Sequence, residues 1–327
     1  MSLYRTILKR AWDNTWQHKY LWFFGLFAAL LGNGGELELI FRNYDGQARD
    51  VLFPTWQRFA ETGIFNGSAL SNIANLARTE PYTLFLALTT LFIIVLLVMF
   101  ILWLTIISQV AIVHNTAKIK HDKEHDFKDG VMQGIKNFWP VLGFNLIIKL
   151  ISAVLLFLIG LPIFFGFVKT TFTINLTYVL MFIIFIPISL VLSFVFKFAI
   201  VHTVVKGQKF LESIKSGFEL FKKNWLVSME MAILLFFINF LTGIALLMMF
   251  LILAVPLLFA ILMFSKLFAF INFWLFIMSA IILLLLMVVF VGSMLSTFQI
   301  SAWTHLFMEL VGKGGVSKLV RVFGKEK

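Results

Sequence analysis

The chain has 327 residues, of which 61% are hydrophobic, 17% aromatic and only 13% charged. Soluble domains contain about 45–50% apolar and about 25% charged residues, so this composition excludes an ordinary soluble enzyme. The formal net charge of +11 comes from basic residues between long apolar blocks, a pattern typical of membrane orientation and not of nucleic-acid binding. Cys is absent, which excludes disulfides, thiolate nucleophiles and cysteine-ligated metal centres.

Apolar blocks along the chain predict membrane spans, because a helix needs about 20 residues to cross a bilayer. Six blocks lie at 20–31, 82–113, 138–168, 171–200, 225–264 and 267–303, and the first is short. Pro162 and Pro256 are the expected break points within the long blocks, since proline lacks the N–H and clashes with the preceding turn. If residues 257–264 form a segment of their own, the chain has seven spans instead.

Lysine and arginine predict the orientation, because cytoplasmic loops carry an excess of basic residues. Most of the 27 basic residues lie in the N-terminal segment, in the loops after the second and fourth spans, and in the C-terminal tail. We therefore expect a multi-pass protein of the cell membrane with both termini cytoplasmic, which requires an even number of spans. A signal peptide is the alternative for the N-terminus, but no Ala-x-Ala-like site follows at 31–33, so we expect no cleavage.

Internal repetition is the most informative feature of the sequence. Ala-Ile-Val-His at 111–114 recurs at 199–202, and the weaker copy at 302–305 keeps the Ala and the His. A Gly-x6-Asn-aromatic pattern also occurs twice, at 130–138 and 217–225. The sequence thus predicts an all-α polytopic membrane protein with six transmembrane helices in three parallel repeats of an amphipathic helix plus two spans. The repeats fall at about 1–120, 121–207 and 208–327 of a single membrane domain, with an outer loop at 33–81.

Basic amphipathic segments open the repeats, at roughly 3–18, 124–136 and 208–223. Apolar residues at helical spacing between lysines are typical of a helix that lies in the membrane interface, with its lysines toward anionic lipid. Helices that only cap the bundle are the compatible alternative. The expected interface anchors are Trp12, Trp16, Trp22, Trp139, Phe210, Ile214, Phe218, Phe221 and Trp225.

Three histidines, His114, His202 and His305, close the repeats. A three-histidine metal site is one interpretation. We prefer the interpretation that each imidazole bonds the last carbonyls of its own helix, as His does near a helix C-terminus. We therefore expect no metal and no other cofactor.

Five polar residues lie within the predicted spans: Gln109, Lys149, Lys197, Glu230 and Gln299. Gln109, Lys197 and Gln299 precede the three histidines by five, five and six residues. Ionisable groups at such depth usually face the bundle interior or a cavity, so the five form a candidate substrate or proton path. The structural alternative, which we prefer, is a Lys149–Glu230 pair or a snorkelling Lys149.

Catalytic motifs are missing from the sequence: it contains no His-Glu-x-x-His, Gly-x-Ser-x-Gly or P-loop pattern. On its aromatic start at Trp12, Trp16 and Trp22 and its Gly-x6-Asn-aromatic entries, the chain resembles bacterial six-span membrane proteins related to the membrane domain of glycerophosphoryl diester phosphodiesterases. The resemblance implies the six-span fold. It does not imply phosphodiesterase activity, because the catalytic domain is not in this sequence.

Two functions from different classes remain. We expect a non-enzymatic integral membrane protein whose cytoplasmic interfacial helices organise lipid or partner proteins. Its partners would be anionic lipids of the inner leaflet, membrane proteins or a second copy of the chain, and not nucleic acid. The alternative is a transporter or lipid-handling protein with a polar path. A water-filled cavity that reaches Lys149 would favour the transporter, whereas a close-packed core would favour the first function.

Overall fold

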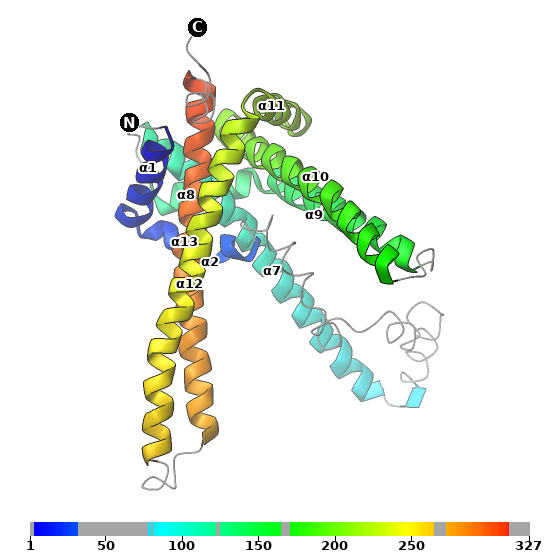
Figure 1. Cartoon of the computed structure of the whole chain (residues 1–327), viewed down its shortest axis with the longest axis vertical. Coiled ribbons are helices and arrows are strands. Elements are labelled where there is room, and N and C mark those ends of the chain that lie inside the picture. Colours follow the sequence, from blue (N-terminus) through cyan, green and yellow to red (C-terminus); the bar gives the residue numbers. More distant parts are fainter. Residues whose placement is uncertain are drawn as a thin grey trace. The chain divides into compact units, whose positions relative to one another are not determined.

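A computed structural model describes residues 3–31, 78–79, 81–121, 125–164, 171–264 and 273–313, and its regular elements there are all helices (Figure 1). In chain order they are α1 (Leu3–Gln17), α2 (Tyr20–Ala28), the 3-10 helix η1 (Ala29–Leu31), α7 (Pro81–Lys120), α8 (Phe127–Lys136), α9 (Phe138–Phe164), α10 (Thr171–Lys206), α11 (Phe210–Lys223), α12 (Trp225–Phe264) and α13 (Phe273–Lys313). The predicted outer loop at 33–81 lies almost entirely outside the described residues.

Five of the described helices are long and apolar enough to cross a membrane. The stretches that are long and apolar enough are Leu84–Lys120, Phe138–Leu155, Pro187–Lys206, Trp225–Ile252 and Ile281–Gly312. The all-α membrane class is confirmed, but the first predicted span, at 20–31, is not among these five. There α2 has 9 residues and η1 has 3, well below the ~20 that a crossing needs.

Proline does not break the long helices where the sequence suggested that it would. Helix α12 continues from Trp225 to Phe264 through Pro256, so residues 257–264 form no separate segment and the seven-span alternative loses its basis. Helix α10 likewise contains Pro187. Proline removes one backbone hydrogen bond, a loss that transmembrane helices tolerate through small local adjustments. Helix α9 ends at Phe164, two residues after Pro162.

The chain divides into two compact units, residues 1–34 with 105–327, and residues 35–104. The longest described element of the second unit is residues 81–104 of α7, and the rest of this helix belongs to the first unit. From Leu91 to Phe100 all of its side chains are exposed and apolar, as expected of a helix surrounded by lipid. All contacts described below lie within the first unit.

The core of this larger unit lies where the C-terminal parts of α7, α10 and α13 meet. The buried residues of these helices concentrate in 105–117, 193–204 and 293–310. The Trp303 ring of α13 lies 5.4 Å from the ring of Phe194 and 6.3 Å from that of Phe198, both on α10. Thr116 of α7 and Ser301 of α13 form a hydrogen bond of 3.0 Å between their hydroxyls. These contacts make a close-packed centre of three helices.

The amphipathic helices dock onto the spans through glycines. A Cβ added to Gly130 of α8 would lie 3.1 Å from the Ala111 Cβ of α7, and one added to Gly217 of α11 would lie 3.0 Å from the Ala199 backbone nitrogen of α10. Both glycines and both alanines occupy matched positions of the internal repetition. Because a larger side chain would push the helices apart, glycine is needed here for close approach. Helix α1 packs along α13 in turn, with a fully buried Ala11.

An asparagine connects α8 to α9, and another connects α11 to α12, in the same way. The Asn137 and Asn224 side-chain amides each donate a hydrogen bond of 3.1 Å to the carbonyl four residues earlier. The next helix begins at the following aromatic residue, Phe138 or Trp225. The Gly-x6-Asn-aromatic pattern therefore encodes a docking glycine, a turn and the start of a span.

Candidate functional site

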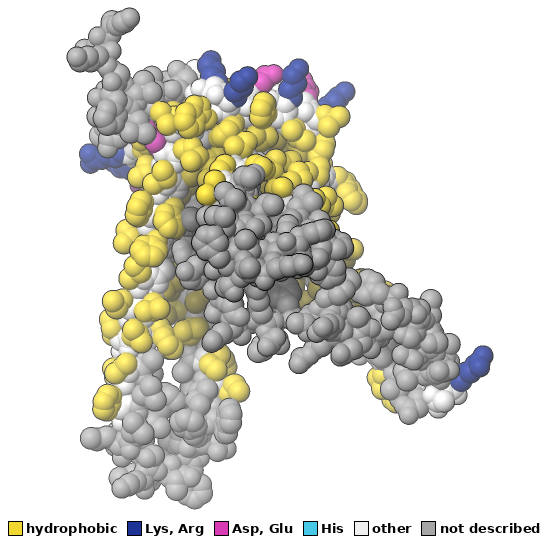
Figure 2. Space-filling model, turned by 45° about the vertical axis from the view of Figure 1, so that its right-hand side comes forward, with side chains coloured by type: hydrophobic (Ala, Val, Ile, Leu, Met, Phe, Trp, Pro, Cys, Tyr) yellow, Lys and Arg dark blue, Asp and Glu magenta, His cyan; other side chains and the backbone are white. Residues whose placement is uncertain are grey.

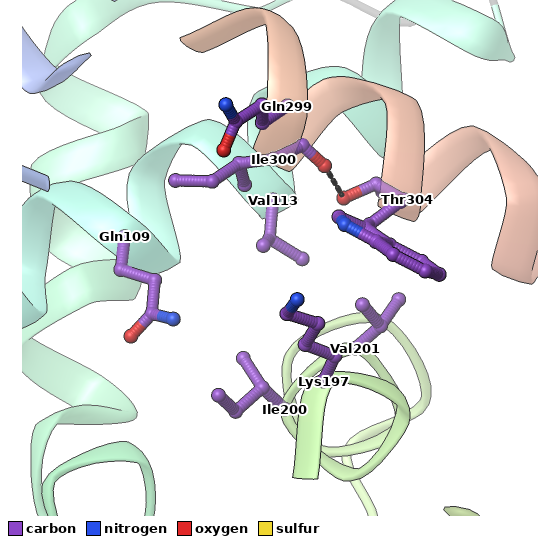
Figure 3. A pocket seen from close by; sticks show the side chains of 9 residues that line it. Gln109, Val113, Lys197, Ile200, Val201, Gln299, Ile300 and Thr304 are labelled. Carbon is purple, nitrogen blue, oxygen red and sulfur yellow. Dashed lines mark hydrogen bonds between the residues drawn. The ribbon is translucent and has the colours of Figure 1, made fainter. Parts of the chain in front are cut away.

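A small cavity lies between α7, α10 and α13 (Figure 3). Its volume is about 30 Å³, and one water molecule needs roughly 10–15 Å³ on this measure, so the cavity has room for about two waters. Its lining consists of Gln109, Val113, Lys197, Ile200, Val201, Gln299, Ile300, Trp303 and Thr304. The structure thus brings together three of the five polar residues predicted from the sequence: Gln109, Lys197 and Gln299.

Neighbouring side chains hold these three polar groups in place. Gln109 Oε1 accepts a hydrogen bond of 2.8 Å from the Asn145 amide of α9. Gln299 Nε2 donates to Asn239 Oδ1 of α12. Lys197 Nζ lies 4.8 Å from the centroid of the Trp303 ring, a geometry in which the ring face attracts a cation. The orientation of each group is therefore set by the surrounding helices.

The other two predicted path residues lie elsewhere. Lys149 is exposed on α9 and does not line the cavity. Glu230 of α12 accepts a hydrogen bond from the Tyr4 hydroxyl of α1. The ion pairs among the described residues do not join Lys149 to Glu230, so the predicted pair is not formed.

The cavity residues are level with the amphipathic helices. On α10, Gly217 of α11 docks against Val195 and Ala199, and Lys197 lies midway between them. On α7, Gly130 and Gly134 of α8 dock against Ala111 and Ile107, and Gln109 lies midway between those. Residues two positions apart point to nearly opposite sides of an α-helix, since each residue advances by about 100°. The spans α7 and α10 therefore each contact an amphipathic helix with one side, and their opposite side lines the cavity.

Two of the repeat histidines bind amphipathic helices, not the ends of their own helices. His114 Nε2 lies 3.0 Å from Asp129 Oδ2 of α8, and His305 Nε2 accepts a hydrogen bond of 3.0 Å from the Asn14 amide of α1. The His202 ring meets the Phe307 ring edge-on at 4.7 Å. The prediction that each histidine bonds the last carbonyls of its own helix is wrong. His114, His202 and His305 lie six, four and eight positions before the ends of their helices. Among the described residues, no group of three His, Cys, Asp or Glu side chains could hold a metal ion.

Two carboxylates reinforce this docking. Asp129 of α8 lies 2.7 Å from Lys118 Nζ of α7. The hydrogen bond from Lys118 is the main reason that the pKa of Asp129 falls below its usual value, and His114 adds to the effect. Glu309 of α13 lies 2.8 Å from Arg10 Nη1 of α1 and 3.2 Å from Lys120 Nζ of α7. Each amphipathic helix named here is thus tied to a span by charge as well as by packing.

The predicted interface anchors fall into two groups. The first group is exposed and consists of Trp12, Trp16, Trp139, Phe218 and Trp225. Trp22 is half-buried and donates a hydrogen bond of 2.7 Å to the Thr15 carbonyl. Phe210, Ile214 and Phe221 instead pack into the bundle. Phe210 stacks on Phe144 at 4.4 Å and Phe221 on Phe194 at 5.3 Å.

Three outward-facing apolar residues, Leu211 of α11 and Met132 and Ile135 of α8, were not among the predicted anchors. On α11, Leu211 is 77% exposed and lies seven residues before the predicted anchor Phe218, which is 50% exposed. On α8, Met132 and Ile135 are exposed and lie three residues apart, on one side of that helix. The seven-residue spacing was a readable signal, since such positions share one helix face. Figure 2 shows Lys and Arg side chains along one edge of the surface, beside a broad area of hydrophobic side chains.

Comparison of the chain with models of protein families, with curated proteins and with solved structures finds no match. Its function is therefore inferred from the geometry of these residues.

Proposed function

We propose that this chain is a non-enzymatic integral membrane protein that organises anionic lipids or partner proteins at the cytoplasmic face of the membrane. The surface responsible consists of the outward sides of α1, α8 and α11. The observation that carries the proposal is that these helices are docked onto the spans by one side while exposing apolar and basic side chains on the other.

Each of the three helices exposes both kinds of side chain. Helix α1 exposes Trp12 and Trp16 with Arg5 and Lys9, and α8 exposes Met132 and Ile135 with Lys128 and Lys136; α11 exposes Leu211 and Phe218 with Lys215, Lys222 and Lys223. Apolar side chains of this kind enter the boundary between headgroups and acyl chains. Lysines beside them attract anionic lipid, by about 1 kcal/mol for each basic residue near the surface. The combination favours an anionic leaflet over a neutral one.

Docking makes this surface different from a free amphipathic peptide. An isolated helix of 10 or 14 residues, the lengths of α8 and α11, is marginal in water. Here the glycine contacts and the Asp129–Lys118 pair order the helices before any lipid arrives. A surface that is already ordered loses less conformational entropy on binding, which suits a constitutive role better than a reversible switch.

We also propose the finer topology expected from the sequence: three copies of one repeat, six spans with α2 beginning the first, and both termini cytoplasmic. The matched contacts of Gly130 and Gly217 and the matched turns at Asn137 and Asn224 support the repeat. The same features support the proposed relation to the six-span family that the sequence resembles.

The alternative function, a transporter with a polar path, has one observation in its favour, the meeting of Gln109, Lys197 and Gln299 at a cavity. Lys149 does not line that cavity, and the helices around it are close-packed. A water-filled cavity that reaches Lys149 would have favoured a transporter. Because the core is close-packed and Lys149 lies outside the cavity, the arrangement favours the organising role.

Lipid retention tests the proposal. The protein is extracted in detergent from membranes that contain equal amounts of labelled phosphatidylglycerol and phosphatidylcholine, and the copurified lipids are measured. We expect enrichment of phosphatidylglycerol that falls when Lys209, Lys215, Lys222 and Lys223 are replaced by Gln and as salt rises, because exposed charges are screened. Replacement of the same residues by Arg, which keeps the charge, is the matched control. Equal retention of the two lipids by the unaltered protein contradicts the proposal.

A further inference from the structure

Lys149 is a charged side chain on the outward side of a membrane span. It follows Phe138 by eleven residues in the spanning stretch Phe138–Leu155 of α9, a distance of about 16 Å along the helix axis. Since the hydrocarbon core of a bilayer is about 30 Å thick, this position lies well inside the apolar region. The Lys149 side chain is exposed, and so are those of Leu146 and Ala153, its neighbours on the same side of the helix. Lys149 therefore faces lipid and not the interior of the bundle.

Acidic residues of the described spans do not supply a counter-charge for this lysine. A lysine at such depth is costly unless its charge is compensated, and the ion pairs among the described residues do not include Lys149. The five spanning stretches contain two acidic residues, Glu230 and Glu309. Glu230 accepts a hydrogen bond from Tyr4, and Glu309 forms two ion pairs within its own chain. A second copy of these spans therefore offers no available carboxylate to Lys149.

The reach of the lysine side chain decides which part of a lipid it contacts. Side chains of an α-helix lean toward its N-terminus, and α9 begins directly after α8, the helix placed above at the membrane interface. Trp139, 76% exposed, is the interface residue at that end of α9. Lys149 follows it by ten residues, about 15 Å along the axis, and the four-carbon stem of a lysine covers only part of that distance. The ammonium thus stays below the headgroups, where the deepest charged group of a phospholipid is its phosphate.

We propose that Lys149 binds the phosphate of one phospholipid, whose acyl chains lie along the apolar outward side of α9. Because the ammonium approaches from the hydrocarbon side, it contacts the phosphate and not the terminal headgroup, so the site accepts phosphatidylcholine and phosphatidylglycerol alike. The surface of α1, α8 and α11 instead attracts net negative charge. The new site goes beyond the organising role proposed above and rests only on the interfacial position of α8. Its failure leaves the lipid retention result unaffected.

Native mass spectrometry of the full purified chain tests the proposal. The delipidated protein in detergent is titrated with dioleoylphosphatidylcholine, or with a glucosyl diacylglycerol that has the same acyl chains and no phosphate. We expect saturable binding of one phosphatidylcholine per chain and no saturable binding of the glycolipid. Phosphatidylcholine is chosen because it carries no net charge for the lysines of α1, α8 and α11 to attract. Added salt should change this binding little, because ions screen a buried pair much less than an exposed one.

Replacement of the lysine shows whether its charge holds the lipid. We expect Lys149→Met to raise the dissociation constant for phosphatidylcholine by roughly tenfold, the effect of losing one hydrogen bond to a charged group. Lys149→Arg keeps the charge and should bind as the unaltered protein does. Since Lys149 is exposed, neither substitution disturbs the core. The matched control is Ile233→Met, at an exposed position of α12, which leaves binding unchanged.

A partner protein with an acidic residue is the competing occupant of this side of α9. A photoreactive amino acid at Leu146, in membranes with phosphorus-labelled lipid, identifies the neighbour of Lys149, and we expect label attached to the chain. Crosslinks to a protein alone overturn the proposal. So do an unaltered chain that binds phosphatidylcholine no better than the glycolipid and an unchanged dissociation constant in Lys149→Met.

Discussion

His305 of α13 accepts a hydrogen bond from Asn14 of α1, with 3.0 Å between Nε2 and Nδ2, across 291 positions of the sequence. Both side chains are buried, 2% and 5% exposed. The bond fastens the first amphipathic helix to the last span and thereby joins the two ends of the described chain. It also explains why a histidine lies in the interior of α13, eight residues before the end of that helix.

Loss of this bond should destabilise the protein. The Asn14→Ala substitution leaves the His305 nitrogen buried without its donor, a loss that costs about 1–3 kcal/mol. We expect a lower thermal unfolding midpoint in detergent, measured by the far-ultraviolet signal of helix. Lys9→Ala, on the exposed side of α1, is the control and should change the midpoint little. Equal midpoints for the two variants would show that the bond contributes nothing.

The docking glycines should tolerate no side chain. In Gly217→Ala the new methyl would lie 2.7 Å from the Val195 carbonyl oxygen of α10, so the backbones must separate and α11 should become more accessible to protease. Gly243→Ala in α12 is the matched control, because its Cβ meets nothing within 4 Å. Alanine there replaces a helix-interior glycine and should be neutral or stabilising, by up to about 1 kcal/mol. Identical protease resistance of both variants would contradict the glycine-docking model.

Acid should weaken the attachment of α8. The pKa of Asp129 is held below its ordinary value of 3.8, first by the hydrogen bond from Lys118. A carboxyl whose folded-state pKa is depressed contributes stability that is complete above the ordinary value and is lost as pH falls through the folded-state value. Because Asp129 is partly exposed, we expect an effect of about 1 kcal/mol or less.

The Asp129→Asn substitution tests this dependence. We expect the variant to unfold more easily than the unaltered protein at neutral pH. The difference should shrink as pH falls below 3.8 and vanish once pH is below the lowered pKa of Asp129, where both side chains are uncharged. Unfolding midpoints measured across this pH range check the prediction. A difference that persists undiminished in acid would assign the effect to packing and not to charge.

The proposed topology places the three amphipathic helices on one side of the membrane. Since the chain contains no Cys, single replacements at exposed positions report sidedness without background. Cysteines at Lys9, Lys128 and Lys215 should all react with a membrane-impermeant thiol reagent from the cytoplasmic side alone. A cysteine at Arg78, before α7, should react only from outside. Reaction of any of the first three from outside refutes the topology.

The sequence by itself determined the class of the protein and the position of its helices. An apolar content of 61% can be accommodated only in lipid, and backbone polar groups in lipid must bond within helices or closed barrels. The amphipathic segments predicted at 3–18, 124–136 and 208–223 match α1, α8 and α11 to within three residues. The ends of α8 and α11 are local properties, since each helix stops at an asparagine and the next helix begins at the aromatic residue that follows.

Which side of each helix faces the bundle could be decided only by the tertiary structure. For α11 the sequence pattern favoured Phe210, Ile214, Phe218 and Phe221 as lipid anchors. Only Phe218 is exposed, whereas the other three pack against the spans and Leu211 faces outward instead. The contacts of His202 and His305 escaped prediction for the same reason. Asn14, for example, lies 291 positions from His305. Local spacing in a sequence does not indicate which distant side chain will contact a buried polar group in the folded protein.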